Sequence, residues 1–142
     1  MVSKKGFTIL ELLIVIAVIA ILTGIALPRF KGMQDEGNIA KARGELRMLQ
    51  TAIESYRVHN NALPASLTNL QTAVPQIAPT TIPTDPFGGA NYGYNTAGDF
   101  FVVYSIGPGG TGGSASITSA GVASDTQQAI YATNGSPVDA TP

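Results

Sequence analysis

The sequence of 142 residues contains no cysteine and only one histidine, His59. Without cysteine the chain forms no disulfide, so packing or a bound ion has to stabilise any exported domain. Thiol catalysis and zinc–thiolate sites are excluded for the same reason. His59 lies at the end of a predicted helix, and we interpret it as a solvated residue without a chemical role. Since no catalytic triad, metal-binding cluster or paired carboxylates stand out, we do not predict an enzyme.

Positive charge is absent from the second half of the chain. All eight lysine and arginine residues lie at or before Arg57, and four aspartates are the only charged residues from Val58 to Pro142. The net charge of −1 predicts no general attraction to nucleic acid. A polar and weakly charged second half is typical of a solvated, exported domain. Without its apolar N-terminal run, the chain is still long enough to form one small hydrophobic core.

Charge is also nearly absent from the first part of the chain. Of the 21 residues from Phe7 to Leu27, only Glu11 is charged, and most of the others are Ile, Leu, Val or Ala. As an α-helix this run would be about 31 Å long, close to the thickness of the hydrocarbon core of a bilayer. A helix that is apolar on every side is buried in protein or in lipid, and this chain is too small to enclose it. We therefore predict a transmembrane helix, with Lys4 and Lys5 keeping the N-terminus in the cytoplasm.

A cleavable secretory signal peptide is the alternative interpretation of this N-terminus. Such a peptide has a shorter apolar core, followed by a cleavage site with two small residues. The apolar run here is longer, and Leu27-Pro28-Arg29-Phe30 does not match such a site. We therefore favour an anchor that remains attached to the mature chain.

Glu11 is the exception within the apolar run. An ionised carboxylate is costly in hydrocarbon, and a simple anchor gains nothing from it. One interpretation is a partner cation, which the run itself does not contain, because Lys4 and Lys5 lie outside the membrane. The other interpretation is that the side chain extends to the polar interface.

An amphipathic helix is predicted after the apolar run. Its apolar residues recur at spacings of three and four, which places them on one helical face: Ile39, Ala42, Leu46, Leu49, Ile53 and Tyr56. About two to three heptads are too few to require a coiled coil, so we predict that this face packs on a small sheet. The polar pair Asn60-Asn61 and the following Pro64 predict the end of this helix.

Gly24 and Pro28 weaken the turn between the two helical segments. Pro28 has no N–H to bond the carbonyl of Gly24, and glycine itself lowers helix stability. Either the helix ends at Leu27, or it continues through this weakened turn to His59.

A hairpin is the clearest structure predicted in the remaining chain. Phe100–Ile106 is aromatic and β-branched, and Gly98-Asp99 before it predicts a turn from a short strand at residues 92–94. Residues 85–89, Asp-Pro-Phe-Gly-Gly, predict a separate turn. The glycine-rich residues 107–113 lack the Gly-Lys-Ser/Thr of a phosphate-binding loop. Beyond them the chain is rich in Ser, Thr, Ala and Gly, and only Ile130-Tyr131 suggests a short edge strand.

The N-terminal residues carry a family resemblance. Lys4-Lys5-Gly6, then Phe7-Thr8-Ile9-Leu10-Glu11 and a long apolar run, resemble the class III signal of type IV pilins and type II secretion pseudopilins. The resemblance implies that a prepilin peptidase removes residues 1–6 by cleaving between Gly6 and Phe7, and methylates the new N-terminus. It also implies that Glu11 pairs with the N-terminal amine of a neighbouring subunit. At Gly24 and Pro28 it implies a continuous helix that kinks, or melts locally, when subunits pack.

Residues after the amphipathic helix, which form the predicted globular head, point to one branch of this family. Residues 84–88 (Thr-Asp-Pro-Phe-Gly), 92–94 (Tyr-Gly-Tyr) and 104–110 resemble the head of the major pseudopilin of type II secretion. The implied fold is α+β. A long N-terminal helix, transmembrane over residues 7–28, continues as an amphipathic helix packed on a small antiparallel sheet, within a head spanning residues 29–142 and having a loop-rich C-terminal region.

The implied function is that of a structural subunit of a helical filament that supports export of folded proteins. Implied partners are further copies of the chain, the prepilin peptidase, an inner-membrane assembly platform and minor pseudopilins or minor pilins. The resemblance implies a single-pass protein of the bacterial inner membrane with its head in the periplasm. A type IV pilin of a surface fibre for adhesion, motility or DNA uptake is the alternative. The third reading, an enzyme or ligand-binding domain on an anchor, lacks supporting residues.

The C-terminal region departs from the family pattern. The family's final loop supplies aspartates to a structural calcium ion, but Gly109-Gly110 stands where this pattern has Asp-Gly. Asp125 is the only nearby acid, with Asp99 and Asp139 more remote in sequence. Because calcium prefers six to eight oxygen ligands with several carboxylates, we predict no tight calcium site and no other cofactor.

Overall fold

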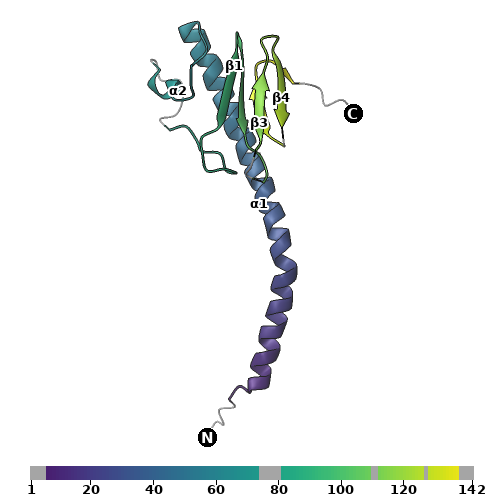
Figure 1. Cartoon of the computed structure of the whole chain (residues 1–142). Coiled ribbons are helices and arrows are strands. Elements are labelled where there is room, and N and C mark those ends of the chain that lie inside the picture. Colours follow the sequence, from purple (N-terminus) through teal and green to yellow (C-terminus); the bar gives the residue numbers. More distant parts are fainter. Residues whose placement is uncertain (1–5, 74–80, 110–111, 127, 138–142) are drawn as a thin grey trace. The chain divides into compact units, whose positions relative to one another are not determined.

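The structure is a computed structural model that describes residues 6–73, 81–109, 112–126 and 128–137, with the backbone alone for residues 27–29. The chain divides into two compact units, Met1–Glu36 and Gly37–Pro142. Helix α1 (Ile9–Asn60) contributes to both units, and all other elements belong to the second (Figure 1). The predicted combination of a long N-terminal helix and a small antiparallel sheet is confirmed.

Helix α1 is continuous over 52 residues. Its backbone remains helical from Gly24 through residue 28, so the alternative in which the helix ends at Leu27 is wrong. The kink or local melting that the other alternative allows during assembly stays a prediction. At the far end Asn61 has a φ of 53°, a left-handed conformation that asparagine adopts readily after a helix. The predicted C-terminal boundary is therefore confirmed to within one residue.

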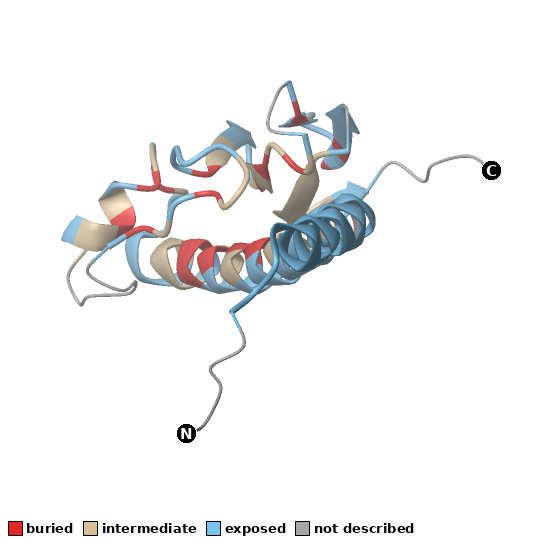
Figure 2. Ribbon diagram, turned by 90° about the horizontal axis from the view of Figure 1, so that it is seen from below, coloured by how far each residue is buried: buried red, intermediate tan, exposed pale blue. Residues whose placement is uncertain are grey.

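The predicted apolar face of α1 forms one side of the hydrophobic core of the second unit. Leu46, Leu49 and Ile53 are at most 1% exposed, and they pack with Phe101 and Val103 of the sheet. Figure 2 shows the buried residues of this helical segment on the side that faces the strands. The single-turn helix α2 (Asn69–Thr72) adds the buried Leu70 to the same core. The spacing of three and four residues thus predicted the buried face correctly.

The first sheet has the order β1-β2-β5, and both of its strand pairs are antiparallel. Strands β1 (Gly93–Ala97) and β2 (Phe100–Ser105) form the predicted hairpin, with Ala97 opposite Phe100 and Gly98 at a φ of 61° in the turn. Strand β5 (Ile130–Thr133) is the predicted edge strand, although it is twice as long as Ile130-Tyr131.

A second sheet, β3-β4-β6, was not predicted. It contains β3 (Ser114–Ile117), β4 (Val122–Thr126) and β6 (Ser136–Pro137), with β3–β4 antiparallel and β4–β6 parallel. In β2, Val102 is fully buried although it does not join the core beneath Phe101 and Val103, because successive side chains point to opposite faces of a strand. The Nδ2 group of Asn95, which lies opposite Val102, donates a 2.7 Å hydrogen bond to the carbonyl of Ala115 in β3. The second sheet therefore covers the face of the first that points away from α1.

Asp85 is the most buried charged side chain of the described residues, with 3% exposure. Its Oδ1 accepts hydrogen bonds from Phe87 N–H at 3.0 Å and Ser105 Oγ at 2.8 Å, and its Oδ2 accepts one from Ile106 N–H at 2.8 Å. The carboxylate thus joins the turn of residues 85–89 to the end of β2. The sequence predicted the turn but not this long-range contact.

We expect Asp85→Asn to lower the free energy of unfolding by about 1–3 kcal/mol, because the amide nitrogen cannot accept a hydrogen bond and leaves a buried donor unpaired. Asp99→Asn is the matched control, since the Asp99 side chain is 83% exposed and surface substitutions change stability by about 0.5 kcal/mol or less. Denaturant unfolding of the full chain in detergent, followed by circular dichroism, measures both. Equal destabilisation by the two substitutions would contradict a specific role for Asp85.

Candidate processing and assembly site

Glu11 and Thr8 form a reciprocal set of hydrogen bonds at the start of α1. Thr8 directly precedes the first helical residue, and its N–H and Oγ1 each donate a 2.8 Å hydrogen bond to Oε2 of Glu11. The N–H of Glu11 in turn donates to Oγ1 of Thr8 at 3.2 Å. This arrangement is a capping box, in which two side chains satisfy backbone donors that the first helical turn leaves unpaired.

The capping box gives Glu11 a polar partner within its own chain. The sequence interpretations considered a cation from another chain or the polar interface, and they missed Thr8. The signal was present, because Thr-x-x-Glu ahead of an apolar run is the pattern of a capping box. Only Oε2 of Glu11 takes part, and Oε1 has no hydrogen-bond partner among the residues that the structure describes.

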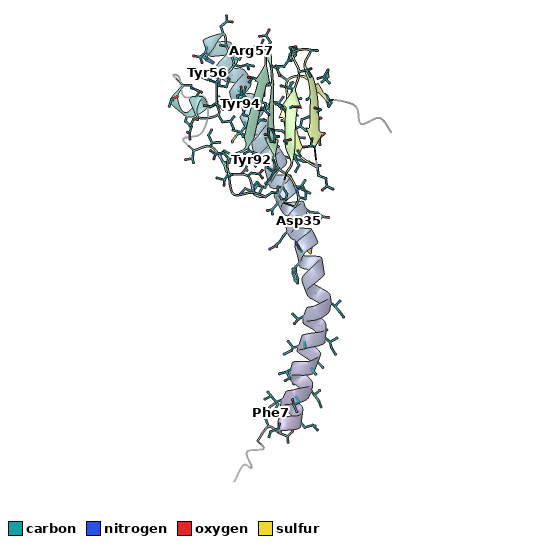
Figure 3. All side chains as sticks on the ribbon, viewed as in Figure 1. Phe7, Asp35, Tyr56, Arg57, Tyr92 and Tyr94 are labelled. Atoms are coloured by element: carbon teal, nitrogen blue, oxygen red, sulfur yellow. The ribbon has the colours of Figure 1, made fainter. Side chains whose placement is uncertain are left out.

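Gly6 and Phe7 precede α1 in an exposed segment without regular secondary structure. Phe7 is 85% exposed, and Figure 3 shows its side chain at the start of the helix. A Cβ placed on Gly6 would meet no atom within 4 Å. The peptide bond between these two residues is therefore accessible to a protease. Lys4 and Lys5 lie outside the described residues, so their predicted position relative to a membrane stays a prediction.

The apolar part of α1 is long and hydrophobic enough to cross a membrane. Its most apolar window has a mean hydropathy of 2.9, and none of that window is buried against the rest of the chain. Ile9, Leu13, Ile16 and other large apolar side chains along it are more than half exposed. Gly24 contacts nothing that would exclude a Cβ. Its predicted role in assembly, and that of Pro28, stay predictions.

The predicted weak calcium ligand, Asp125, lies exposed on β4 opposite Ala115 of β3. Within the described part of the chain no three acidic or histidine side chains come together as a metal site. Gly110 and Asp139 fall outside the described residues. The glycine-rich loop that begins at Gly107 lies directly against the backbone of Gln128. A Cβ on Gly107, which has a φ of 77°, would lie 2.2 Å from the carbonyl oxygen of Gln128. A donor set with one carboxylate does not fit calcium well.

Two family models match the chain and together cover most of it. The prokaryotic N-terminal methylation motif matches residues 1–27, which contain Gly6, Phe7 and Glu11. The model described as type II secretion system protein G matches residues 29–120. No solved structure matches the chain.

Several curated relatives are type II secretion system core protein G. The chain is 28% identical to that of Klebsiella michiganensis over 61% of this chain and 70% of the relative. It is 26% identical to that of Pseudomonas aeruginosa over 78% of this chain and 88% of the relative. A fimbrial protein of Pseudomonas aeruginosa is 36% identical, but only over 49% of this chain and 46% of the relative. The match over residues 29–120, which covers more than half of the sequence, shows that the chain belongs to the protein G family of type II secretion systems.

Proposed function

We propose that this chain is the repeating subunit of a type II secretion pseudopilus, the filament that supports export of folded proteins. The observation that carries the proposal is the apolar part of α1. It is long and uncovered, and its single carboxylate, that of Glu11, accepts hydrogen bonds from Thr8 of the same chain. Such a helix needs lipid before assembly and other helices after it. The match to the protein G family supports this filament over others.

Processing would convert the N-terminus into the missing cation. Cleavage between Gly6 and Phe7 removes residues 1–6 and creates a free amine at Phe7, which is then methylated. Thr8 and Glu11 both follow the cut, so the capping box is retained in the mature chain. Its unused oxygen, Oε1, is then available to the amine of Phe7 from a neighbouring subunit. This pairing would set the axial register between copies, because an unpaired charge in an apolar filament core is costly.

The proposal also covers where the subunit lies before assembly and which proteins it meets. Before assembly the subunit is anchored in the inner membrane by residues 7–28, with its N-terminus in the cytoplasm and its head, residues 29–142, in the periplasm. It meets the prepilin peptidase, the inner-membrane assembly platform and minor pseudopilins, and Gly24 and Pro28 let the helix adapt when copies pack. It acts as a structural subunit and not as a catalyst.

A type IV pilin of a surface fibre is the second candidate. The fimbrial relatives favour it, but they match only about half of this chain, whereas protein G relatives match up to 78%. Neighbouring genes separate the two, since a secretin with secretion genes supports the pseudopilus and a retraction ATPase supports the fibre.

The first test concerns processing. Co-expression with a prepilin peptidase should yield a mature protein that begins at Phe7 and carries one added methyl group. Intact-mass and N-terminal peptide mass spectrometry measure both changes. A mature N-terminus within or after the apolar run would contradict the proposal, because the chain would then have lost its anchor.

The second test separates the cap from the charge at Glu11. In Glu11→Gln the remaining amide oxygen can still accept from Thr8, so we expect helix formation, insertion and processing to be retained. Filament yield should fall strongly, because the neutral amide no longer attracts an amine. Sheared filaments quantified by immunoblot and electron microscopy give the yield.

Thr8→Ser, which keeps the capping hydroxyl, is the matched control and should assemble normally. Wild-type yield from both Glu11→Gln and Glu11→Ala would show that no charge pair is needed. In that case the carboxylate serves only as the helix cap.

The third test concerns calcium. With Asp125 as the one nearby carboxylate, we expect the melting temperature of the chain to be the same in micromolar free calcium and in chelator. Saturation at 100 times the dissociation constant would instead add about 2.7 kcal/mol of stability. That is several degrees for a domain of this size. A shift of that size at micromolar calcium, abolished by Asp125→Asn, would overturn the prediction.

A further inference from the structure

A groove lies between α1 and β5 within the second unit. It consists of two adjacent hollows of about 460 and 430 Å³, which share Arg43, Ile130 and Tyr131 in their walls. One hollow begins at Ile39 of the helix and includes Ala129 at the approach to β5, whereas the other extends to Gln50 and Gly135. Because residue numbers rise together along both walls, helix and strand run in the same direction along the groove.

The strand wall of the groove is an edge of the first sheet, with which no other strand of the described residues pairs. Phe101 of β2 directs its N–H and C=O toward β5, since they bond Asn134 Oδ1 at 2.8 Å and Thr133 Oγ1 at 2.6 Å. The backbone N–H and C=O groups of successive residues in a strand point to alternate sides. Val103 therefore bonds its partner Ala132, whereas Tyr131 and Thr133 direct their N–H and C=O groups away from β2, to the opposite edge of β5.

Gln50 shows that this opposite edge faces α1. Its Nε2 donates a 3.0 Å hydrogen bond to the carbonyl of Thr133. The N–H of Thr133, and the N–H and C=O of Tyr131, have no hydrogen-bond partner within the described residues. These three groups form an open template for another strand.

The helix wall carries two arginines. Arg43 and Arg47 are exposed, and residues four apart lie on the same helical face. Among the described residues neither forms an ion pair, whereas Lys41 pairs with Glu45 and Arg57 pairs with Asp99. Of the residues that the structure describes, the arginines are the only ones with charged side chains that line the groove.

Two carboxylates lie beside the groove without lining it. Glu54 accepts a 3.2 Å hydrogen bond from Gln50. Burial, together with the negative charge of Asp125, raises the pKa of Tyr131. The groove therefore combines a guanidinium pair, an open strand edge and a neutral tyrosine.

We propose that this groove binds an extended, acidic peptide segment of a partner protein, which adds a strand to β5 and places its carboxylates on Arg43 and Arg47. Strand addition satisfies the open backbone groups, and arginine binds carboxylate through two parallel hydrogen bonds. Four helical residues rise about 6 Å, and two strand residues span about 6.7 Å. The two arginines therefore match acidic residues at alternate positions of the incoming strand.

A second copy of the chain does not supply such a segment from its described residues. Strand β1, the other edge of the same sheet, contains no charged residue. Asp99 lies in a turn and is paired with Arg57, and Asp125 lies in β4, which has neighbours on both sides. No described strand or turn of a second copy therefore fits the groove, so the proposal commits to a segment of a different protein and goes beyond filament formation.

The test uses the full processed chain in nanodiscs of zwitterionic lipid. The probe is a blocked, labelled peptide, Thr-Val-Asp-Val-Asp-Val-Thr, and its control has Asn in place of each Asp. We expect saturable binding of the acidic peptide by fluorescence anisotropy, and slower hydrogen exchange at the amides of Tyr131 and Thr133. Arg43→Gln with Arg47→Gln should weaken binding by about tenfold or more, because two charge-assisted hydrogen-bond pairs are lost.

Two substitutions serve as controls. Lys41→Gln makes the same kind of charge change on the same helix outside the groove, and it should leave affinity unchanged. Asp125→Asn removes a nearby negative charge and should tighten binding. Processing and filament yield should be normal in the Arg43→Gln/Arg47→Gln variant, so failure of this proposal is distinct from failure of the filament proposal.

Several results would overturn the inference. They are absence of binding at millimolar peptide, equal binding of the Asn peptide, and equal weakening by Lys41→Gln. Binding without protection of Tyr131 and Thr133 would exclude strand addition. If the double substitution leaves peptide binding unchanged but lowers filament yield, the groove is a contact between copies. If it lowers only binding to phosphatidylglycerol vesicles, the groove contacts lipid.

Discussion

Packing between α1 and β2 is the interaction on which the folded head depends. The helix contributes Leu46, Leu49 and Ile53, and β2 contributes Phe101 and Val103, all of which are almost fully buried. At about 25 cal/mol for each Å² of apolar surface removed from water, such side chains dominate the stability of a small domain. No disulfide supplements them, because the chain contains no cysteine. Strands β1 and β5 pair with β2, β3 lies against it, and α2 adds Leu70 to the same core.

The two faces of β2 explain how the rest of the head is arranged. One face rests on α1, and the other carries the fully buried Val102 toward the second sheet. Asp85 then holds the end of β2 through Ser105 and Ile106, so the turn before β1 and the end of β2 form one unit. A buried carboxylate with three hydrogen bonds does here what a disulfide does in many exported domains, since both connect loops that are distant in sequence.

At the start of α1, a second carboxylate, that of Glu11, accepts hydrogen bonds that the helix backbone would otherwise lack. The first turn of a helix leaves backbone donors unpaired, and in an apolar environment water cannot satisfy them. Thr8 and Glu11 satisfy each other there, using one carboxylate oxygen. An acidic residue in this position is therefore compatible with a single membrane-inserted chain, and it keeps an oxygen for a partner. The two interpretations of Glu11 that the sequence allowed, an interface position and a charge pair, describe different moments of one assembly cycle in our proposal.

Several features could be predicted from the sequence because they depend only on residues that are neighbours in the chain. The apolar run, the buried face of α1, the β1–β2 hairpin and the end of α1 near Asn60 all follow from composition, spacing and turn residues, and the structure has each of them. The processing junction that we predict at Gly6-Phe7 depends equally on neighbouring residues and stays a prediction. Thr8 could have been recognised in the same way, because the Thr-x-x-Glu spacing was visible in the sequence.

Tertiary structure decided what depends on residues far apart. Strands β3 and β4 are short and rich in Ser and Ala, and the small buried side chains Ala115 and Ala123 give no strong hydrophobic alternation to predict them. The role of Asp85 required Ser105 to lie beside it, and the groove required β5 to lie along α1 with Arg43 and Arg47. The sequence by itself therefore determined the long helix and its apolar run, and it predicted the processing junction, since each depends on contiguous residues. Only the folded chain brought an unpaired strand edge beside two arginines, because that juxtaposition depends on packing between segments more than 80 residues apart.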